Sequence, residues 1–220
     1  MKGIHDNGLL LLVDKPRQWT SFDVVKKLKK ELKIKKMGHA GTLDPLATGL
    51  LLIATGKKTK ELHAIQELDK SYQGIIEIGK TTPSFDLETP FDSESDWSYI
   101  TDAAIQSARS NLLGEIIQVP PKYSAVKING ERAYKKARRN ENVNIKSRRV
   151  QIFKFNITVS LPQVHFEVVC SKGTYIRSLA NDFGTILGTG AFLKELRRTA
   201  IGQYTIMQSQ TIDEVIQEFQ

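Results

Sequence analysis

One stretch decides how this chain is interpreted: Gly38-His-Ala-Gly-Thr-Leu-Asp-Pro-Leu-Ala-Thr-Gly49. Gly38, Gly41 and Gly49 permit backbone conformations and close approaches that a side chain would block. Pro45 removes an amide donor and biases the residue before it away from helical geometry. The stretch therefore predicts a turn that presents the carboxylate of Asp44, a candidate nucleophile or general base. Taken alone, it equally fits an ordinary turn whose aspartate caps a helix.

The composition is that of an ordinary globular protein with a basic excess. The 220 residues are 40% hydrophobic and 25% charged, and the formal net charge is +8. A chain of this length buries a hydrophobic core without disulfides or metals. The positive charge favours a polyanionic partner, and nucleic acid is the natural candidate because each neutralised phosphate releases counterions.

Several classes of protein are excluded by what the sequence lacks. The apolar run from Leu9 to Val13 is too short for a signal peptide or a membrane span, so we expect a cytoplasmic protein without membrane contact. The single cysteine, Cys170, excludes an internal disulfide and a cysteine-based zinc cluster, and its apolar alternation predicts a buried strand position. The four histidines lack metal-ligand spacing, so no metal site is predicted.

Hydrophobic periodicity predicts strands and helices interleaved without a regular repeat. The helix beginning after Thr20 has a capping box with Asp23, Thr101 caps a second helix, and Thr211 with Glu214 opens a last short one. The apolar run of residues 50–54 fits either a strand or a buried helical turn. Further strands are predicted over 9–13, 72–78, 150–159 and 164–170, and a helix over 174–187. This order predicts a mixed α/β or α+β fold around a large sheet.

Five segments in order along the chain resemble the bacterial tRNA pseudouridine synthase B (TruB) family. The stretch from Gly38 to Gly49 resembles the family's catalytic motif. The other four, which together extend the resemblance over about residues 9–204, are Asp14-Lys-Pro16 with Thr20-Ser21, Gln118 to Lys127, Cys170 to Arg177, and Leu196-Arg-Arg198. An ordinary turn at Asp44 does not explain the other four segments.

The resemblance implies a pseudouridine synthase fold with a large central, mainly antiparallel mixed sheet flanked by helices and loops. It also implies an isomerase that converts the T-loop uridine of tRNA, uridine 55, to pseudouridine after flipping the base out of the RNA. The C1′–N1 bond breaks and C1′ rejoins C5 of the same base, which requires no cofactor, metal or redox change. Whether Asp44 attacks C1′ or assists a glycal-like intermediate stays open at this point.

Residue roles follow from the resemblance. Asp44 is the catalytic aspartate, Tyr72 the stacking residue and possible base, and Arg177 the ion-pair partner of Asp44. His39 fills the space left by the flipped nucleotide, and Leu196 packs under the uracil ring. The expected phosphate contacts are Lys15, Lys60, Lys172, Arg197 and Arg198. Each of these residues, met singly, also fits an ordinary structural place in a sheet, turn or solvated surface.

The chain departs from the family pattern in four places. Gln18 stands where the family usually has glycine, Asn140 stands where many relatives have glycine, and the segment Thr81 to Asp86 differs from the commoner Thr-x-Thr-x-Asp form. Only sixteen residues follow Tyr204, where many relatives carry a small RNA-binding (PUA) domain. We therefore expect a single catalytic domain over residues 1–220, without that domain and with a short helical extension at 205–220, acting as a monomer on the T stem-loop of tRNA.

Two rival functions fit the same residues. One is a synthase that acts on another RNA, such as ribosomal RNA or a guide-directed target. The other is a non-catalytic RNA-binding or RNA-folding module on the same fold. The set of Asp44, Tyr72 and Arg177 argues against the second rival, because binding alone does not require the carboxylate.

Overall fold

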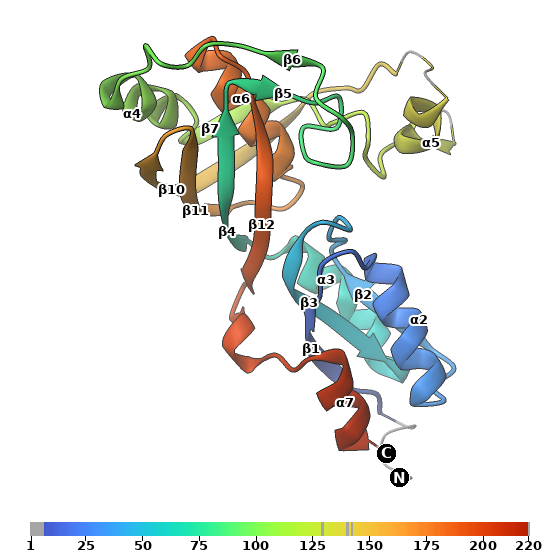
Figure 1. The fold of residues 1–220 in the computed structure, drawn as a ribbon. Coiled ribbons are helices and arrows are strands. Elements are labelled where there is room, and N and C mark those ends of the chain that lie inside the picture. The colour runs from blue at the N-terminus through green and yellow to red at the C-terminus, as the bar shows by residue number, and fades with distance from the viewer. Residues whose placement is uncertain (1–6, 129, 140, 142, 220) are drawn as a thin grey trace. The chain divides into compact units, whose positions relative to one another are not determined.

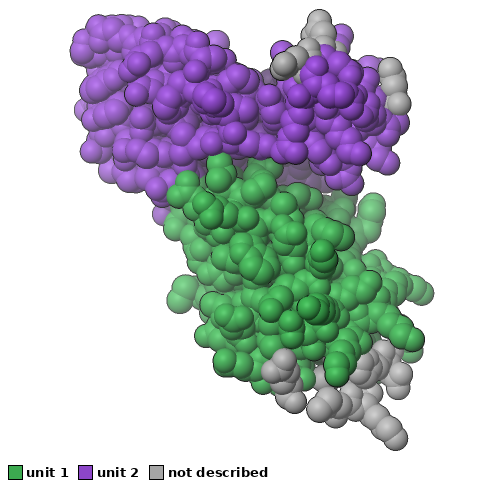
Figure 2. All heavy atoms as spheres, turned by 45° about the vertical axis from the view of Figure 1, so that its right-hand side comes forward, with its two compact units in different colours: residues 1–73, 196–220 green, residues 74–195 purple. Residues whose placement is uncertain are grey.

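A computed structural model describes residues 7–128, 130–139, 141 and 143–219, so Asn140 lies outside the described residues. The chain forms two compact units, which Figure 2 shows in different colours. Unit 1 takes its described residues from 7–73 and 196–219, and unit 2 from 74–195. Strands β4 (Lys70–Ile78) and β12 (Ala191–Ile201) each begin in one unit and end in the other. The single catalytic domain expected from the sequence stays a prediction.

Among the described residues, hydrogen bonds join nine strands into one mixed sheet, which confirms the predicted fold class. Its order is β1-β3-β12-β4-β11-β10-β7, with β2 paired to β3 and β13 paired to β12. The pair β3–β12 is parallel, whereas β1–β3, β2–β3, β10–β11, β10–β7 and β12–β13 are antiparallel. The remaining strands of this sheet are β1 (Leu10–Lys15), β2 (Met37–Ala40), β3 (Thr48–Thr55), β7 (Gly114–Gln118), β10 (Arg148–Ser160), β11 (Gln163–Cys170) and β13 (Tyr204–Thr205).

Strand β3 is the centre of unit 1 and is buried on both faces. This settles the choice between strand and helical turn that the apolar run 50–54 left open. Alternation sends Leu51 and Ile53 into one hydrophobic cluster, while Leu50 and Leu52 enter another on the opposite face. Such a strand reads as a continuous apolar run because neither face meets water.

Two helices cover the Leu51 face of β3. Helix α2 (Ser21–Glu31) begins at the predicted capping box of Thr20 and Asp23, and α7 (Ile212–Phe219) begins at Thr211, whose hydroxyl and backbone amide bond to Glu214. The side chains of Leu28 and Val215, one from each helix, lie in the same cluster. The opposite face is covered by α3 (Leu62–Glu67). The described part of unit 1 also contains two short 3-10 helices, η1 (Gly56–Glu61) and η2 (Ile206–Gln208).

Unit 2 is built on the long antiparallel hairpin of β10 and β11 (Figure 1). Phe155 of β10 packs edge to face against Phe166 of β11 and Phe183 of α6 (Ile176–Leu187). Cys170 is buried in β11, as its alternation predicts. Helix α4 (Asp102–Asn111) begins at the predicted Thr101 cap. The remaining elements are α5 (Ala133–Arg138) and the short ribbons of β5 (Lys80–Thr81) with β6 (Ser93–Glu94) and β8 (Lys127–Ile128) with β9 (Glu131–Arg132).

Neither a membrane span nor a metal cluster is found in the part of the chain that the structure describes. Its helices are too short or too polar to cross a bilayer. Its His, Cys, Asp and Glu side chains do not gather in groups of three or more that could hold a metal ion.

Candidate active site

The predicted turn around Asp44 lies between two strands of unit 1. Strand β2 ends at Ala40 and β3 begins at Thr48. Gly41 has a φ of +72° and Gly49 a φ of +100°, both in the left-handed region that favours glycine. A Cβ atom at Gly49 would lie 2.3 Å from the carbonyl oxygen of Arg198. The two glycines therefore allow the chain to turn and β12 to approach it closely.

Hydrogen bonds hold this turn against the segment that follows β1. The backbone amide of Leu43 donates to Oγ of buried Ser21 at 2.9 Å, and that hydroxyl donates to the Leu43 carbonyl at 3.3 Å. The backbone amide of Gln18 donates to the Pro45 carbonyl at 2.7 Å. The half-buried Asp44 is therefore presented on a backbone fixed on both sides of it. Ser21 is a positioning residue that the sequence motif contained but that sequence reasoning did not single out.

Lys15 supports the same turn from inside the protein. Its side chain is 0% exposed, and Nζ donates to the carbonyls of Pro16 (2.9 Å), Trp19 (2.6 Å) and Pro45 (3.4 Å). Burial lowers the pKa of Lys15 to about 8, while the nearby Asp44 carboxylate opposes that shift. Through the bond to Pro45, Lys15 helps to hold the Asp44 turn. It also lies in the lining of a surface pocket, and its predicted phosphate contact stays a prediction.

Strand β12 brings its Leu-Arg-Arg segment beside the turn, with the parallel partners Arg197↔Thr48 and Arg198↔Gly49. Arg198 is 1% exposed and donates to backbone carbonyls, so the expectation of a phosphate contact conflicts with burial. Arg197 is partly exposed and forms a two-point ion pair with Asp14, with Nη–Oδ distances of 2.6 and 3.0 Å. Leu196 is partly buried.

A surface pocket of about 550 Å³ opens beside this ion pair in unit 1. Its lining includes Asp14, Trp19, Arg197 and Asp213, and it therefore mixes both charges with an aromatic side chain.

The other predicted residues of unit 1 lie on separate elements. His39 lies on β2 opposite Ile53, and burial followed by the charge of Arg198 lowers its pKa, so the imidazole is neutral at neutral pH. Tyr72 lies on β4 with a partly exposed side chain. Lys60 is exposed in η1. The roles of these three residues toward RNA stay predictions.

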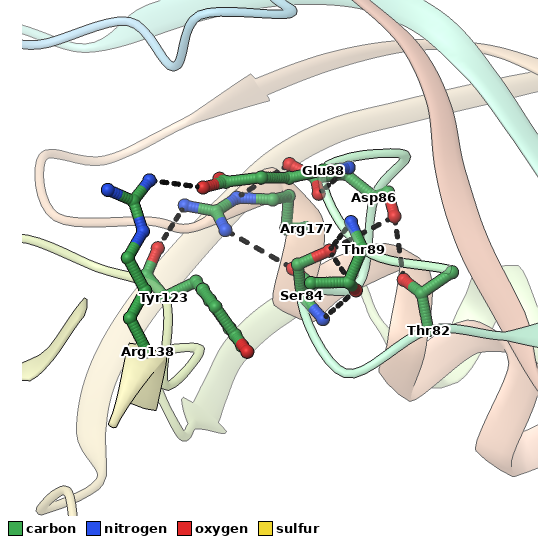
Figure 3. A network of polar contacts seen from close by, with 8 residues as sticks. All are labelled: Thr82, Ser84, Asp86, Glu88, Thr89, Tyr123, Arg138 and Arg177. Carbon is green, nitrogen blue, oxygen red and sulfur yellow. Dashed lines mark hydrogen bonds and ion pairs between the residues drawn. The ribbon is translucent and has the colours of Figure 1, made fainter. Parts of the chain in front are cut away.

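Arg177 belongs to unit 2, so its predicted ion pair with Asp44 of unit 1 stays a prediction. It lies in the first turn of α6 and is 2% exposed. Figure 3 shows its guanidinium at the centre of a polar network. Nη1 donates to the Ser84 carbonyl at 3.2 Å, Nη2 donates to the Tyr123 carbonyl at 2.9 Å, and Nε lies 3.6 Å from Oδ2 of Asp86.

Asp86 is an acid that sequence reasoning did not assign to the site, although it closes the segment Thr81 to Asp86 that departs from the family form. It is 5% exposed, and the backbone amide of Glu88 donates to its Oδ1 at 2.9 Å. Its carbonyl accepts from the hydroxyls of Thr82 and Ser84, at 2.7 and 3.1 Å. These bonds fix the carboxylate toward Arg177 (Figure 3).

Helix α5 is tied to this loop by an ion pair. Arg138 donates to Glu88 at 2.8 Å and also lies over the ring of Tyr134. The Glu88 carboxylate, with burial opposing it, raises the pKa of Arg138 above its usual value. Lys172, the remaining predicted phosphate contact, is exposed between β11 and α6.

Unit 1 therefore carries the elements of an acid-based site. A half-buried carboxylate lies on a turn held by glycines, by Ser21 and by two buried cations, Lys15 and Arg198. A carboxylate on a held turn can act as nucleophile or general base.

Comparison with known proteins places nearly the whole chain in one family. Residues 29–176 match the family described as TruB family pseudouridylate synthase (N terminal domain), and residues 177–220 match tRNA pseudouridylate synthase B C-terminal domain. The chain is 51% identical over 207 residues to tRNA pseudouridine synthase B of Flavobacterium johnsoniae, covering 90% of each chain. It is 47% identical over 218 residues to tRNA pseudouridine synthase B of Chloroherpeton thalassium, covering 96% of this chain and 90% of that protein.

Solved structures share the fold. A chain in the crystal structure of a Cbf5-Nop10-Gar1 complex is 29% identical with a TM-score of 0.74, and the match covers 96% of this chain and 54% of that one. A chain in the structure of an H/ACA RNP bound to a substrate RNA containing 2′-deoxyuridine is 26% identical with a TM-score of 0.72, covering 96% and 53%. The chain thus spans just over half the length of these solved chains.

Proposed function

Because the chain belongs to the TruB family of pseudouridylate synthases, we propose that it isomerises uridine 55 of tRNA to pseudouridine. The main support for this function is the family match over residues 29–220. The matched region includes the Asp44 turn, which is fixed by the hydrogen bond between Leu43 and Ser21. The enzyme is an isomerase. The C1′–N1 bond breaks, C1′ bonds to C5 of the same uracil, the hydrogen on C5 leaves and N1 gains one, so no external reactant is consumed.

Asp44 acts on the ribose in this proposal. Its carboxylate either attacks C1′ or assists formation of a glycal-like intermediate, and the Lys15 and Arg198 side chains bond to the backbone of the turn that carries it. Arg177 is the ion-pair partner of Asp44. Tyr72 stacks on the uracil, and its phenol is placed to take the proton from C5.

In this proposal, RNA is bound by the predicted RNA-binding residues whose side chains reach the surface. Lys60, Lys172 and Arg197 contact phosphates of the T stem-loop, His39 occupies the space of the flipped nucleotide, and Leu196 packs under the uracil. The neutral imidazole suits His39 to this place, because it adds a flat ring without adding charge. The protein works as a monomer in the cytoplasm, where tRNA is modified.

The first test is the variant Asp44→Asn on unmodified tRNA, with pseudouridine mapped chemically. We expect the product to disappear, while the dissociation constant for tRNA stays within about twofold, because the amide preserves shape but removes the charge that the reaction uses. Asp102→Asn, an exposed aspartate at the start of α4, is the matched control and should remain active. Full activity of Asp44→Asn would refute the role of Asp44.

A second candidate substrate is an RNA other than tRNA. The likeness to a chain from an H/ACA RNP that was solved with a substrate RNA favours including it. Modified positions in ribosomal RNA and tRNA, compared between the wild-type strain and a deletion strain, separate the two. Loss of pseudouridine confined to ribosomal RNA would refute the tRNA assignment while leaving the chemistry intact.

A further inference from the structure

Arg198 is a buried cation whose charge no carboxylate of the described residues neutralises through an ion pair. It is 1% exposed and is among the largest fully buried side chains of the described protein. Its guanidinium donates to the backbone carbonyls of Leu50 and Gly41. Burial of a charge without a paired acid carries a desolvation penalty in free energy. We therefore expect the Arg198 charge and hydrogen bonds to have a role that offsets this penalty.

The two hydrogen bonds of Arg198 join the two ends of the Asp44 turn. Nη2 donates to the carbonyl of Gly41, three residues before Asp44, at 3.0 Å. Nε donates to the carbonyl of Leu50, six residues after Asp44, at 2.7 Å. The backbone of Arg198 meanwhile pairs with Gly49, so both the main chain and the side chain of this residue meet the turn.

The geometry requires a guanidinium. Nε and Nη2 point their donors in fixed directions within one plane, and this fork spans two carbonyls that are nine residues apart in sequence. A lysine ammonium carries the same charge but is a point donor on a flexible stem. Arg198→Lys therefore separates the charge of this residue from its geometry.

The charge of Arg198 is felt by the groups around the turn. It contributes to lowering the pKa of His39 and that of Lys15, and Lys15 in turn interacts with the Asp44 carboxylate. The Arg198 charge thus acts on two groups that lie around the turn, Lys15 and His39.

We propose that Arg198 is a positioning residue for the catalytic carboxylate: it ties both ends of the Asp44 turn and supplies a buried positive charge beside it. The proposal rests on the proposed pseudouridine synthase function. It replaces the expected phosphate contact for this residue, because the side chain has almost no surface to offer RNA. Arg198 acts through Asp44 and does not itself touch the reacting atoms.

The test compares Arg198→Lys and Arg198→Met with wild type in three measurements: the single-turnover rate on tRNA, the dissociation constant for tRNA, and unfolding in urea. We expect the rate to fall about tenfold in Arg198→Lys and about 100-fold in Arg198→Met, since small misplacements of a catalytic group cost this much. Binding of tRNA should stay within about twofold in both variants. Arg149→Met, which removes an exposed arginine paired with Glu115, is the control for loss of one positive charge.

Each alternative has its own outcome. A folded Arg198→Met with the wild-type rate would overturn the proposal, as would weakened tRNA binding with an unchanged single-turnover rate, which identifies a phosphate contact. Equal rate losses in both variants, in proportion to their losses of stability, would show a purely structural residue. If Arg198→Met does not fold, the single-turnover rate and the tRNA dissociation constant of Arg198→Lys still test the proposal. An unchanged rate in that variant would overturn it. Wild-type protein that forms no pseudouridine would refute the proposed function itself, before any variant is compared.

Discussion

Gln18 occupies a backbone conformation that suits glycine better than any other residue. Its φ is +68°, and its amide donates to the carbonyl of Pro45 in the Asp44 turn. The chain thus keeps the geometry of the family's usual glycine while carrying a side chain there. For a residue with a Cβ atom, left-handed geometry costs about 1–2 kcal/mol.

Gln18→Gly should therefore stabilise the protein. The relief of strain exceeds the extra chain entropy that glycine loses on folding, about 0.5–1 kcal/mol, so we expect a net gain of about 0.5–1 kcal/mol in the free energy of unfolding. Urea denaturation measures it. Arg17→Gly, at the preceding exposed residue outside the left-handed region, is the control and should lose stability. A loss of stability in Gln18→Gly would contradict the argument.

At the scale of elements, the adjacent residues Thr20 and Ser21 make different hydrogen bonds: one caps helix α2, and the other joins that helix to the Asp44 turn. Thr20 is exposed and caps the helix by accepting from the amide of Asp23 at 3.0 Å. Ser21 is buried and bonds instead to the backbone of Leu43, one residue before Asp44. The position of the helix therefore determines the position of the turn.

Thr20→Ala and Ser21→Ala should separate helix stability from catalysis. Loss of the Thr20 cap costs about 1 kcal/mol and should leave the single-turnover rate unchanged. Loss of the Ser21 hydroxyl leaves the buried Leu43 amide without its partner, which costs about 1–3 kcal/mol, and it should also lower the rate because the turn loosens. Urea unfolding and rapid-quench kinetics measure the two effects. An unchanged rate in a folded Ser21→Ala would show that Ser21 does not position Asp44.

What the sequence predicted correctly was mostly local. The capping residues Thr20, Thr101 and Thr211 were found because each meets its partner three residues away, where one helical turn brings them together. The apolar run of β3 stayed ambiguous because a strand buried on both faces lacks alternation.

What the sequence left out depended on contacts between distant segments. Arg177 and Asp86 are 91 positions apart, and no period or spacing links them. The burial of Lys15 and Arg198 was missed because lysine and arginine are usually exposed, so that a basic residue near an RNA motif is taken for a phosphate contact. Only the pairing of β1 and β12 with β3 shows where these charges lie.

At the scale of the whole molecule, the net charge of +8 should make tRNA binding depend strongly on salt. The logarithm of the binding constant should fall linearly with the logarithm of the salt concentration, with a slope set by the number of phosphates contacted. Lys172→Ala should reduce the magnitude of that slope by about 1, because an exposed phosphate contact is removed. Titrations by filter binding at several salt concentrations give the slope. Lys154→Ala, an exposed β10 lysine beside Glu167, should leave it unchanged, and an unchanged slope for Lys172→Ala would remove that residue from the RNA interface.

Unit 1 is assembled from two stretches of chain, whereas unit 2 is one continuous stretch between them. Translation proceeds from the N-terminus, so all of residues 74–195 are synthesised before Arg198 and α7. Until then the Asp44 turn lacks the guanidinium that joins its ends, and α2 lacks the helix that shares its core cluster. A nascent chain therefore carries Asp44 before the Arg198 hydrogen bonds that join the two ends of its turn can form.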